Sequence, residues 1–332
     1  MDLFTRHESP VLIPRADVDW ASGAVFNPGA WYADGIVHML FRAVPGGYQE
    51  IMVVDEGDTD PRRGFDDYIS YIGYASSRDG KTFAWNNEPL INPGESFDRF
   101  GAEDPRISRI GDLYLITYTA LSRPAFEAYE KNGIRIGLAT TTDFRSVTRH
   151  GVIGPPERDK DAVIFPRLFN GRAAMLHRVF PNIQIAWFDG LEELCGPPDD
   201  YWDNHLATLD DHVIMRREAD WEEKKIGAGP TPIETEEGWL LIYHGVDRNH
   251  VYRAGLALLD LDDPTRVIAR TAKPVFEPET DYELIGDVDN VVFPEGAVVI
   301  DGTLHMYYGA ADKVIGLATA DLSDVLMAVR DL

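Results

Sequence analysis

The sharpest chemical signal in the sequence is the run Glu103-Asp104-Pro105-Arg106. Proline keeps the residue before it extended, so Pro105 fixes the backbone of Asp104. A carboxyl group partly shielded from water can retain its proton near neutral pH and act as a general acid. The alternative is a structural Asp104–Arg106 ion pair, because residues two apart in a strand project from the same side. The run alone favours the ion pair, so the residues around it must decide.

Basic residues lie at the ends of several apolar runs, although the chain is acidic overall. Arg178 and His244 each end such a run, Arg158 and Lys225 each precede one, and Tyr252 begins another. A cluster of cationic groups is what an oxyanion such as phosphate requires. Taken singly, each is a solvated charge or a core histidine. Only their convergence in space would make an anion site.

Composition argues against several classes of function. The chain carries 31 Lys and Arg against 56 Asp and Glu, a formal net charge of −25, which opposes binding to nucleic acid or to an anionic membrane. The nine histidines show no HxH or HExxH spacing, and Cys195 is the only cysteine, so we expect no metal centre and no intrachain disulfide. Neither an apolar leader nor a run of about 18 apolar residues is present, and we expect a cytoplasmic protein.

One pattern recurs five times along the chain. Each copy has a turn containing Gly or Asp, a strand of large apolar residues, and a second strand that in most copies ends in small residues. The first strands are expected at residues 38–42, 114–118, 174–178, 239–244 and 304–308, and the second at 72–75, 136–140, 183–187, 254–257 and 315–319. A spacing of roughly 60 to 75 residues fits four strands with long loops. The sequence therefore predicts an all-β, five-bladed β-propeller forming one domain over residues 1–332.

In a propeller the innermost strands line a central channel, and ligands bind at its mouth. The polar residues that open each copy are therefore candidates, and those of the third copy are expected at Phe165-Pro166-Arg167. A long acidic loop at about residues 45–70 is expected to be a lid or a mobile surface excursion. Short helices are expected at 218–225 and 321–329.

Six runs of the sequence resemble glycoside hydrolase family 130, the β-mannoside phosphorylases and related hydrolases. They are residues 101–106 (GAEDPR), 227–232 (GAGPTP), 241–246 (LIYHGV), 252–264 (YRAGLALLDLDDP), 290–294 (NVVFP) and 307–312 (YYGAAD). The resemblance spans nearly the whole chain and implies a five-bladed propeller, in agreement with the repeat count.

The resemblance also implies residue roles. Asp104 matches the general acid, with Glu103 and Arg106 of the same motif assigned to the substrate. The positions that hold the mannosyl unit match Asn27, Arg42 and Asp312. Those that bind phosphate match Arg158, Arg178, His244 and Tyr252, with Lys225 nearby. One departure is Asp159, which stands where many members have Asn.

The implied reaction is inverting phosphorolysis of manno-oligosaccharides, linked β-1,4 or β-1,2, to α-mannose 1-phosphate. Phosphate is already an anion and needs no base to activate it, so one acid that faces a cluster of cationic groups is sufficient for the reaction. Phosphate is a co-substrate, no cofactor is expected, and a homo-oligomer is left open. Three alternatives remain: a hydrolase of the same family, a hydrolase of arabinose or fructose polymers using Asp161 and Glu295, or a non-catalytic sugar-binding propeller.

Overall fold

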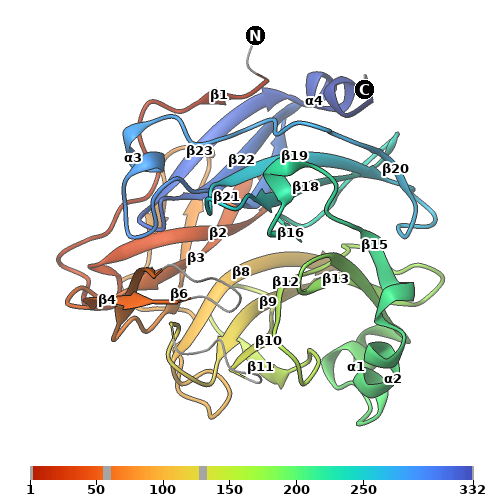
Figure 1. Ribbon diagram of the computed structural model, residues 1–332, viewed down its shortest axis with the longest axis horizontal. Coiled ribbons are helices and arrows are strands. Elements are labelled where there is room, and N and C mark those ends of the chain that lie inside the picture. Colours follow the sequence, from red (N-terminus) through yellow and green to blue (C-terminus); the bar gives the residue numbers. More distant parts are fainter. Residues whose placement is uncertain (1–2, 55–60, 127–132, 331–332) are drawn as a thin grey trace.

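The computed structural model describes residues 3–54, 61–126 and 133–330, and its core is a ring of five antiparallel sheets (Figure 1). Blade 1 contains β2 (Ala24–Ala33), β3 (Ile36–Val44), β6 (Tyr71–Ser77) and β7 (Ala84–Trp85). Blade 2 contains β8 (Gly101–Ile110), β9 (Leu113–Leu121), β10 (Ile134–Thr141) and β11 (Thr148–Val152). Blade 3 contains β12 (Asp159–Ile164), β13 (Ala173–Val179), β14 (Ile183–Phe188) and β15 (Val213–Met215).

Blade 4 contains β16 (Lys225–Ala228), β18 (Gly238–Val246), β19 (Tyr252–Leu259) and β20 (Val267–Arg270), and β17 (Ile233–Thr235) also pairs with β18. Blade 5 contains β21 (Val292–Ile300), β22 (Thr303–Ala310), β23 (Val314–Asp321) and the N-terminal β1 (Thr5–Arg6). Because β1 pairs with β23, the two ends of the chain close the ring within one sheet. The predicted five-bladed propeller is confirmed, and each predicted strand pair falls within the expected blade.

The blades are held together by apolar clusters that lie between them. Each of the five largest clusters of described residues draws on two neighbouring blades. Leu40 of blade 1 shares a cluster with Ile116 of blade 2, and Met39 shares another with Leu317 of blade 5. Alternation along a strand sends adjacent residues such as Met39 and Leu40 to opposite faces. A blade can therefore bury both of its faces only between two others.

The inner strands carry a bulge at one common level. Four of them show a register shift, between Phe26 and Pro28, Glu103 and Arg106, Lys160 and Val163, and Pro294 and Gly296. At three bulges a polar residue takes positive φ: Asn27 (49°), Asp104 (53°) and Asp161 (57°). A bulge breaks the alternation of a strand and re-aims the side chain it carries.

Glycine allows the inner strands to meet closely next to these bulges. A Cβ atom on Gly29 would lie 2.3 Å from the carbonyl oxygen of Pro105, and one on Gly296 would lie 2.7 Å from that of Pro28. Both contacts are with backbone of the neighbouring blade, which cannot move aside as a flexible side chain can.

Within the described parts of the chain, four α-helices and three short 3₁₀ turns lie outside the sheets. They are α1 (Gly190–Cys195), α2 (Tyr201–Ala207), α3 (Asp281–Leu284), α4 (Leu322–Arg330) and the turns Asp19–Ala21, Leu209–His212 and Asp220–Glu222. The helix expected at 321–329 is α4, whereas the helix expected at 218–225 is wrong. Only the turn Asp220–Glu222 forms there, because Lys224 already donates its backbone N–H to Val246 and the chain becomes β16. Helices α1 and α2 lie between β14 and β15. They were not predicted, because apolar residues do not recur there with helical periodicity.

The segment expected as a lid contains a hairpin of β4 (Gln49–Val53) and β5 (Arg62–Asp66); residues 55–60 lie outside the described part. Its base is tied to blade 5. The hydroxyls of Tyr48 and Tyr68 donate to Asp287 at 2.6 and 3.0 Å. Ring contacts between Tyr48, Tyr68 and Phe65 stiffen the same region.

Candidate active site

The bulges open into a cavity of about 250 Å³ at one mouth of the propeller. All the predicted site residues except Arg106 line it: Asn27, Arg42, Glu103, Asp104, Arg158, Arg178, Lys225, His244, Tyr252 and Asp312. They come from all five blades and from the loops beside their strands, so the ring closure described above is what brings them together. Two groups can be distinguished, an acidic half from blades 1, 2 and 5 and a basic half from blades 3 and 4.

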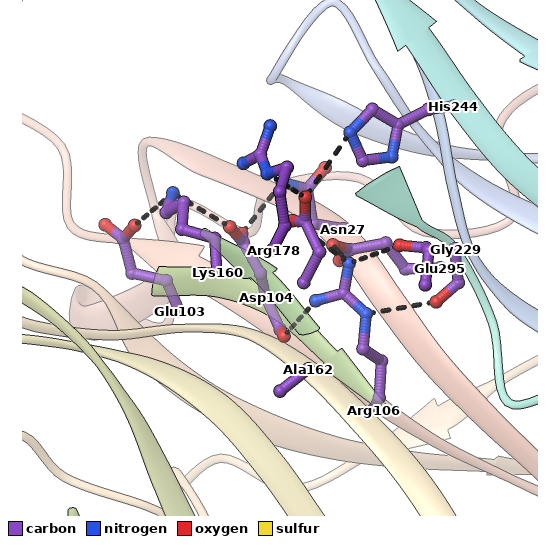
Figure 2. A network of polar contacts seen from close by, with 12 residues as sticks. Asn27, Glu103, Asp104, Arg106, Lys160, Ala162, Arg178, Gly229, His244 and Glu295 are labelled. Atoms are coloured by element: carbon purple, nitrogen blue, oxygen red, sulfur yellow. Dashed lines mark hydrogen bonds and ion pairs between the residues drawn. The ribbon is translucent and has the colours of Figure 1, made fainter. Parts of the chain in front are cut away.

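Asp104 is the centre of the acidic half. Asn27 donates its side-chain amide to Asp104 Oδ1 at 2.8 Å (Figure 2). Arg42 Nη1 lies 3.3 Å from the same oxygen. Lys160 Nζ lies 3.5 Å from Oδ2, and the Asp104 side chain is only 4% exposed. Every charged or polar group named here stabilises the carboxylate form.

The sequence suggested that Asp104 would hold its proton near neutral pH, and the surroundings oppose this. Burial by itself raises the pKa of Asp104, but Lys160, Arg42 and the Asn27 amide outweigh it and lower the pKa to about 2. The neighbouring Glu103 behaves differently. Burial raises its pKa above the ordinary value against the opposing charges of Arg42 and Lys160. The Arg42 guanidinium contacts Glu103 at 2.5 Å and so holds the two carboxyl groups side by side.

Asp312 completes the acidic half from the turn between β22 and β23. Burial raises its pKa to about 7, Arg42 opposes the shift, and the negative charges of Asp104 and Asp287 add to it. Asp312 is therefore partly protonated at neutral pH and can donate as well as accept a hydrogen bond.

The basic half is built around Asp161. Arg178 Nε lies 2.9 Å and His244 Nε2 lies 3.5 Å from Asp161 Oδ2. Arg178 Nη1 and His244 Nδ1 are buried and have no hydrogen-bond partner among the described residues. A buried donor without a partner is costly, and an oxyanion in the cavity would satisfy Arg178 Nη1.

Lys225 adds an amine to this half. Its nitrogen Nζ lies 5.1 Å from the centre of the Tyr252 ring. Burial lowers the pKa of Lys225 well below its ordinary value; Arg178 and Arg158 add to the shift, and Asp161 opposes it. His244, fully buried, also has a pKa well below its usual range because of burial, with Arg178 and Lys225 contributing. The positive charge of Arg178 therefore disfavours protonation of Lys225 and His244, and a bound anion would favour it.

Arg106 lies beneath the cavity rather than in its wall. It is 1% exposed, its Nη2 lies 2.7 Å from Glu295, and it donates to the backbone carbonyls of Asp104 and Gly229 at 3.0 Å each. The bulge at Asp104 shifts the strand alternation, so Arg106 does not project beside the Asp104 carboxyl group. Its contacts tie the inner strands of blades 2, 4 and 5 together, which is a structural role.

Asp159, the departure from the family pattern, does not line the cavity. Its Oδ2 lies 2.8 Å from His177 Nδ1, and its Oδ1 accepts the backbone N–H of Arg178 at 2.9 Å. The neighbours Arg158 and Lys160 line the cavity because successive residues of a strand point to opposite sides.

Two residues that line the site were not assigned to the phosphorylase from the sequence. Lys160 contacts Asp104 and Glu103, and Asp161, named there only for the alternative hydrolase, occupies the bulge position of blade 3. The sequence placed that position at Phe165-Pro166-Arg167, which is wrong, since Arg167 instead pairs with Glu234 at 2.8 Å away from the cavity. Proline follows the bulge residue in Asn27-Pro28 and Asp104-Pro105, but Ala162 follows Asp161. The position of the third bulge could therefore not be recognised from the residue types.

Within residues 3–54, 61–126 and 133–330, no group of three or more His, Cys, Asp or Glu side chains has the geometry to hold a metal ion. None of the helices in that part of the chain has the length and apolar character needed to cross a bilayer.

A ring of five blades with a carboxyl group and a basic half in one central cavity defines a five-bladed β-propeller with a candidate active site at its centre. The model of the family described as beta-1,4-mannooligosaccharide phosphorylase matches residues 17–331. The chain belongs to this family, glycoside hydrolase family 130.

Relatives of this chain carry names for more than one linkage. It is 38% identical over 318 residues to the 1,2-beta-oligomannan phosphorylase of Thermoanaerobacter sp. (strain X514), covering 96% of this chain and 97% of that one. It is 30% identical to the beta-1,4-mannooligosaccharide phosphorylase of Ruminococcus albus, covering 99% of this chain and 91% of the relative. The solved beta-1,2-mannobiose phosphorylase of Listeria innocua superposes with a TM-score of 0.78 at 30% identity, covering 99% of each chain.

Proposed function

We propose that this protein cleaves β-mannosides by inverting phosphorolysis and releases α-mannose 1-phosphate. The observation that carries the proposal is the basic half of the cavity, where the unpartnered donor Arg178 Nη1 and the amine of Lys225 line the same space as Asp104. An anion is the ligand that relieves this charge. Membership of a family described by phosphorylase activity supports the choice of phosphate.

The reaction follows from the two halves. Phosphate held by Arg158, Arg178 and Lys225 attacks the anomeric carbon of the mannosyl unit, which Asn27 and Asp312 hold. The bond to the leaving oxygen breaks as Asp104 gives that oxygen a proton. One displacement from the opposite face inverts the β linkage into the α phosphate ester.

Asp104 must be protonated for this step, although Lys160 and Arg42 keep it ionised in the phosphate-free protein. A phosphate dianion beside Lys160 and Arg178 would offset their charge and raise the pKa of Asp104. Phosphate therefore supplies the nucleophile and also the negative charge that raises the pKa of Asp104. For this reason cleavage should require phosphate.

Hydrolysis would need a carboxylate that activates water. Asp159 is turned away toward His177. Asp161 faces the cavity, but Arg178, His244 and Arg106 outweigh the effect of burial and hold its pKa below the ordinary value, which makes it a weak base.

The test is incubation with β-1,2-mannobiose and with β-1,4-mannobiose, each with and without phosphate. We expect mannose 1-phosphate only when phosphate is present. The higher identity to the relative named for 1,2-linked oligomannan supports β-1,2-mannobiose as the better substrate. Free mannose formed at equal rates with and without phosphate would favour a hydrolase, and binding without cleavage would favour a sugar-binding protein.

A further inference from the structure

A chain of buried polar side chains runs behind the basic half, from β12 to helix α2. Asp159 Oδ2 lies 2.8 Å from His177 Nδ1, and His177 Nε2 lies 3.1 Å from His205 Nε2. Asp159 and His177 are fully buried and His205 is 6% exposed. None of the three lines the cavity, so the proposed reaction leaves them without a role.

The hydrogen positions in this chain follow from its chemistry. An ionised Asp159 only accepts hydrogen bonds, so His177 Nδ1 carries the hydrogen. In neutral His177 the other nitrogen, Nε2, must then accept, and His205 Nε2 donates to it. Burial lowers the pKa of His205 to about 3, with His177 and His212 contributing, so the His205 ring is neutral as this arrangement requires.

This series of hydrogen-bonded side chains ends at the backbone of Arg178, a residue of the basic half. Opposite the blade 3 bulge the regular ladder between β12 and β13 is interrupted, and the N–H of Arg178 goes to Asp159 Oδ1 at 2.9 Å. The next residue, Val179, is also held by a side chain, because its N–H donates to Gln184 Oε1 and its carbonyl accepts from Gln184 Nε2. The end of β13 that carries Arg178 into the cavity is thus fixed by side chains.

We propose that His177 is a positioning residue for the basic half of the site. It acts through Asp159 on the backbone of Arg178 and on the Arg158–Lys160 segment. The proposal rests on the function proposed above. Asp159 accepts two hydrogen bonds, and His177, backed by His205, fixes the rotation of its carboxylate plane. Without that restraint the backbone of Arg178, on the phosphate side of the cavity, is no longer held in one position. The mannosyl side, formed by Asn27, Arg42 and Asp312, keeps its arrangement.

The experiment measures the half-saturating concentrations of phosphate and of mannobiose separately. In Asp159→Ala and His177→Phe we expect the half-saturating phosphate concentration to rise about tenfold, which is the equivalent of one charge-assisted hydrogen bond. The half-saturating mannobiose concentration should change by less than about twofold. A merely structural defect would lower the amount of active protein and move neither value.

Asp159→Asn is the conservative variant and should restore near-normal phosphate use. Asn can accept the Arg178 N–H with Oδ1 and donate from Nδ2 to His177 Nδ1, which reverses the hydrogen positions along the chain. Nitrogen NMR of the histidine rings would show His177 change from Nδ1–H to Nε2–H. The matched control is His305→Phe, another buried strand histidine, which lies in blade 5 and does not line the cavity; its phosphate value should be unchanged.

Thermal unfolding is measured first, and if His177→Phe does not fold, Asp159→Ala, which adds no bulk, carries the test. Folded variants with an unchanged phosphate value, or with both values raised equally, overturn the positioning role. So does an Asp159→Asn protein as impaired as Asp159→Ala. A wild-type protein that needs no phosphate would instead overturn the proposed function, so the two failures are distinguishable.

Discussion

Asn27 and Asp104 stand at equivalent bulges of neighbouring blades, and the Asn27 amide donates to Asp104 Oδ1 across 2.8 Å. The two residues have almost the same positive φ, 49° and 53°. The same kind of bulge thus presents the acid in blade 2 and, in blade 1, the amide that orients it. Because the same oxygen also faces Arg42, the orientation of the Asp104 carboxyl group is fixed before any sugar binds.

The first prediction concerns Asp104 itself. Asp104→Asn keeps the shape of the side chain and removes the proton donor, so we expect the turnover number to fall by about 10²- to 10⁴-fold while the fold is retained. A β-mannoside with a 4-nitrophenyl leaving group needs little protonation and should lose much less. Steady-state rates on both substrates check this. The matched control is Asp112→Asn at a fully exposed side chain, and equal losses on the two substrates would argue against the acid role.

A second prediction follows from the depressed pKa of Lys225. Bound phosphate should raise that pKa, so phosphate binding at neutral to alkaline pH should be accompanied by proton uptake. Calorimetry in buffers of different ionisation enthalpy measures the uptake. Lys225→Met should bind phosphate about ten- to a hundredfold more weakly and take up fewer protons.

The exposed Lys273→Met is the control for this measurement. Asp104→Asn separates the two sources of uptake, since it removes the acid but keeps Lys225. If phosphate bound to wild-type protein with no proton change over the whole pH range, the charge description of the basic half would be wrong.

The strands and the ring were predictable because each blade repeats local signals. The run 239–244 lies within β18, and 304–308 lies within β22, since apolar residues and Gly-containing turns specify them locally. Charge state was not predictable. The pKa of Asp104 depends on Lys160, which is far away in sequence and close only because β8 and β12 are neighbouring inner strands. The bulge at Asp161 escaped notice for a related reason, since pairing with β13 reveals it and its residue types do not.

The third prediction concerns the stability of the protein as a function of pH. Asp312 has a pKa of about 7 in the folded chain and about 3.9 in an unfolded one, so the folded state holds the proton more tightly. Ionising Asp312 therefore destabilises the fold, and this contribution grows as the pH rises from about 4 to about 7. Relative to wild type, Asp312→Asn should gain about 3 kcal/mol in the free energy of unfolding across that window.

Urea unfolding at several pH values checks this, and taking the difference between the two proteins cancels the other titrating groups. Asp112→Asn, at an exposed position, should show a flat difference. A difference for Asp312→Asn that is also flat would mean that Asp312 is ionised at neutral pH. In that case its carboxylate could only accept hydrogen bonds from the sugar.

The last prediction concerns the floor of the cavity. A methyl group on Gly29 would lie 2.3 Å from the carbonyl oxygen of Pro105, the residue that follows the acid, and backbone there has no room to retreat. We expect Gly29→Ala to destabilise the fold by about 3 kcal/mol or more, as overpacking of a tight site does. Gly196→Ala, at a position with open space around the new methyl group, is the control and should change stability by less than about 1 kcal/mol.

The functional consequence of Gly29→Ala separates packing from chemistry. Any chain that folds must push Pro105 outward, and Asp104 moves with it, away from Asn27. Turnover should then fall while the half-saturating phosphate concentration stays near normal, because the basic half belongs to blades 3 and 4 and does not touch Gly29. Chemical denaturation and steady-state kinetics on the same preparation test both expectations. A stable variant with full turnover would show that the inner strands are free to separate and that the close approach of blades 1 and 2 does not hold the acid in place.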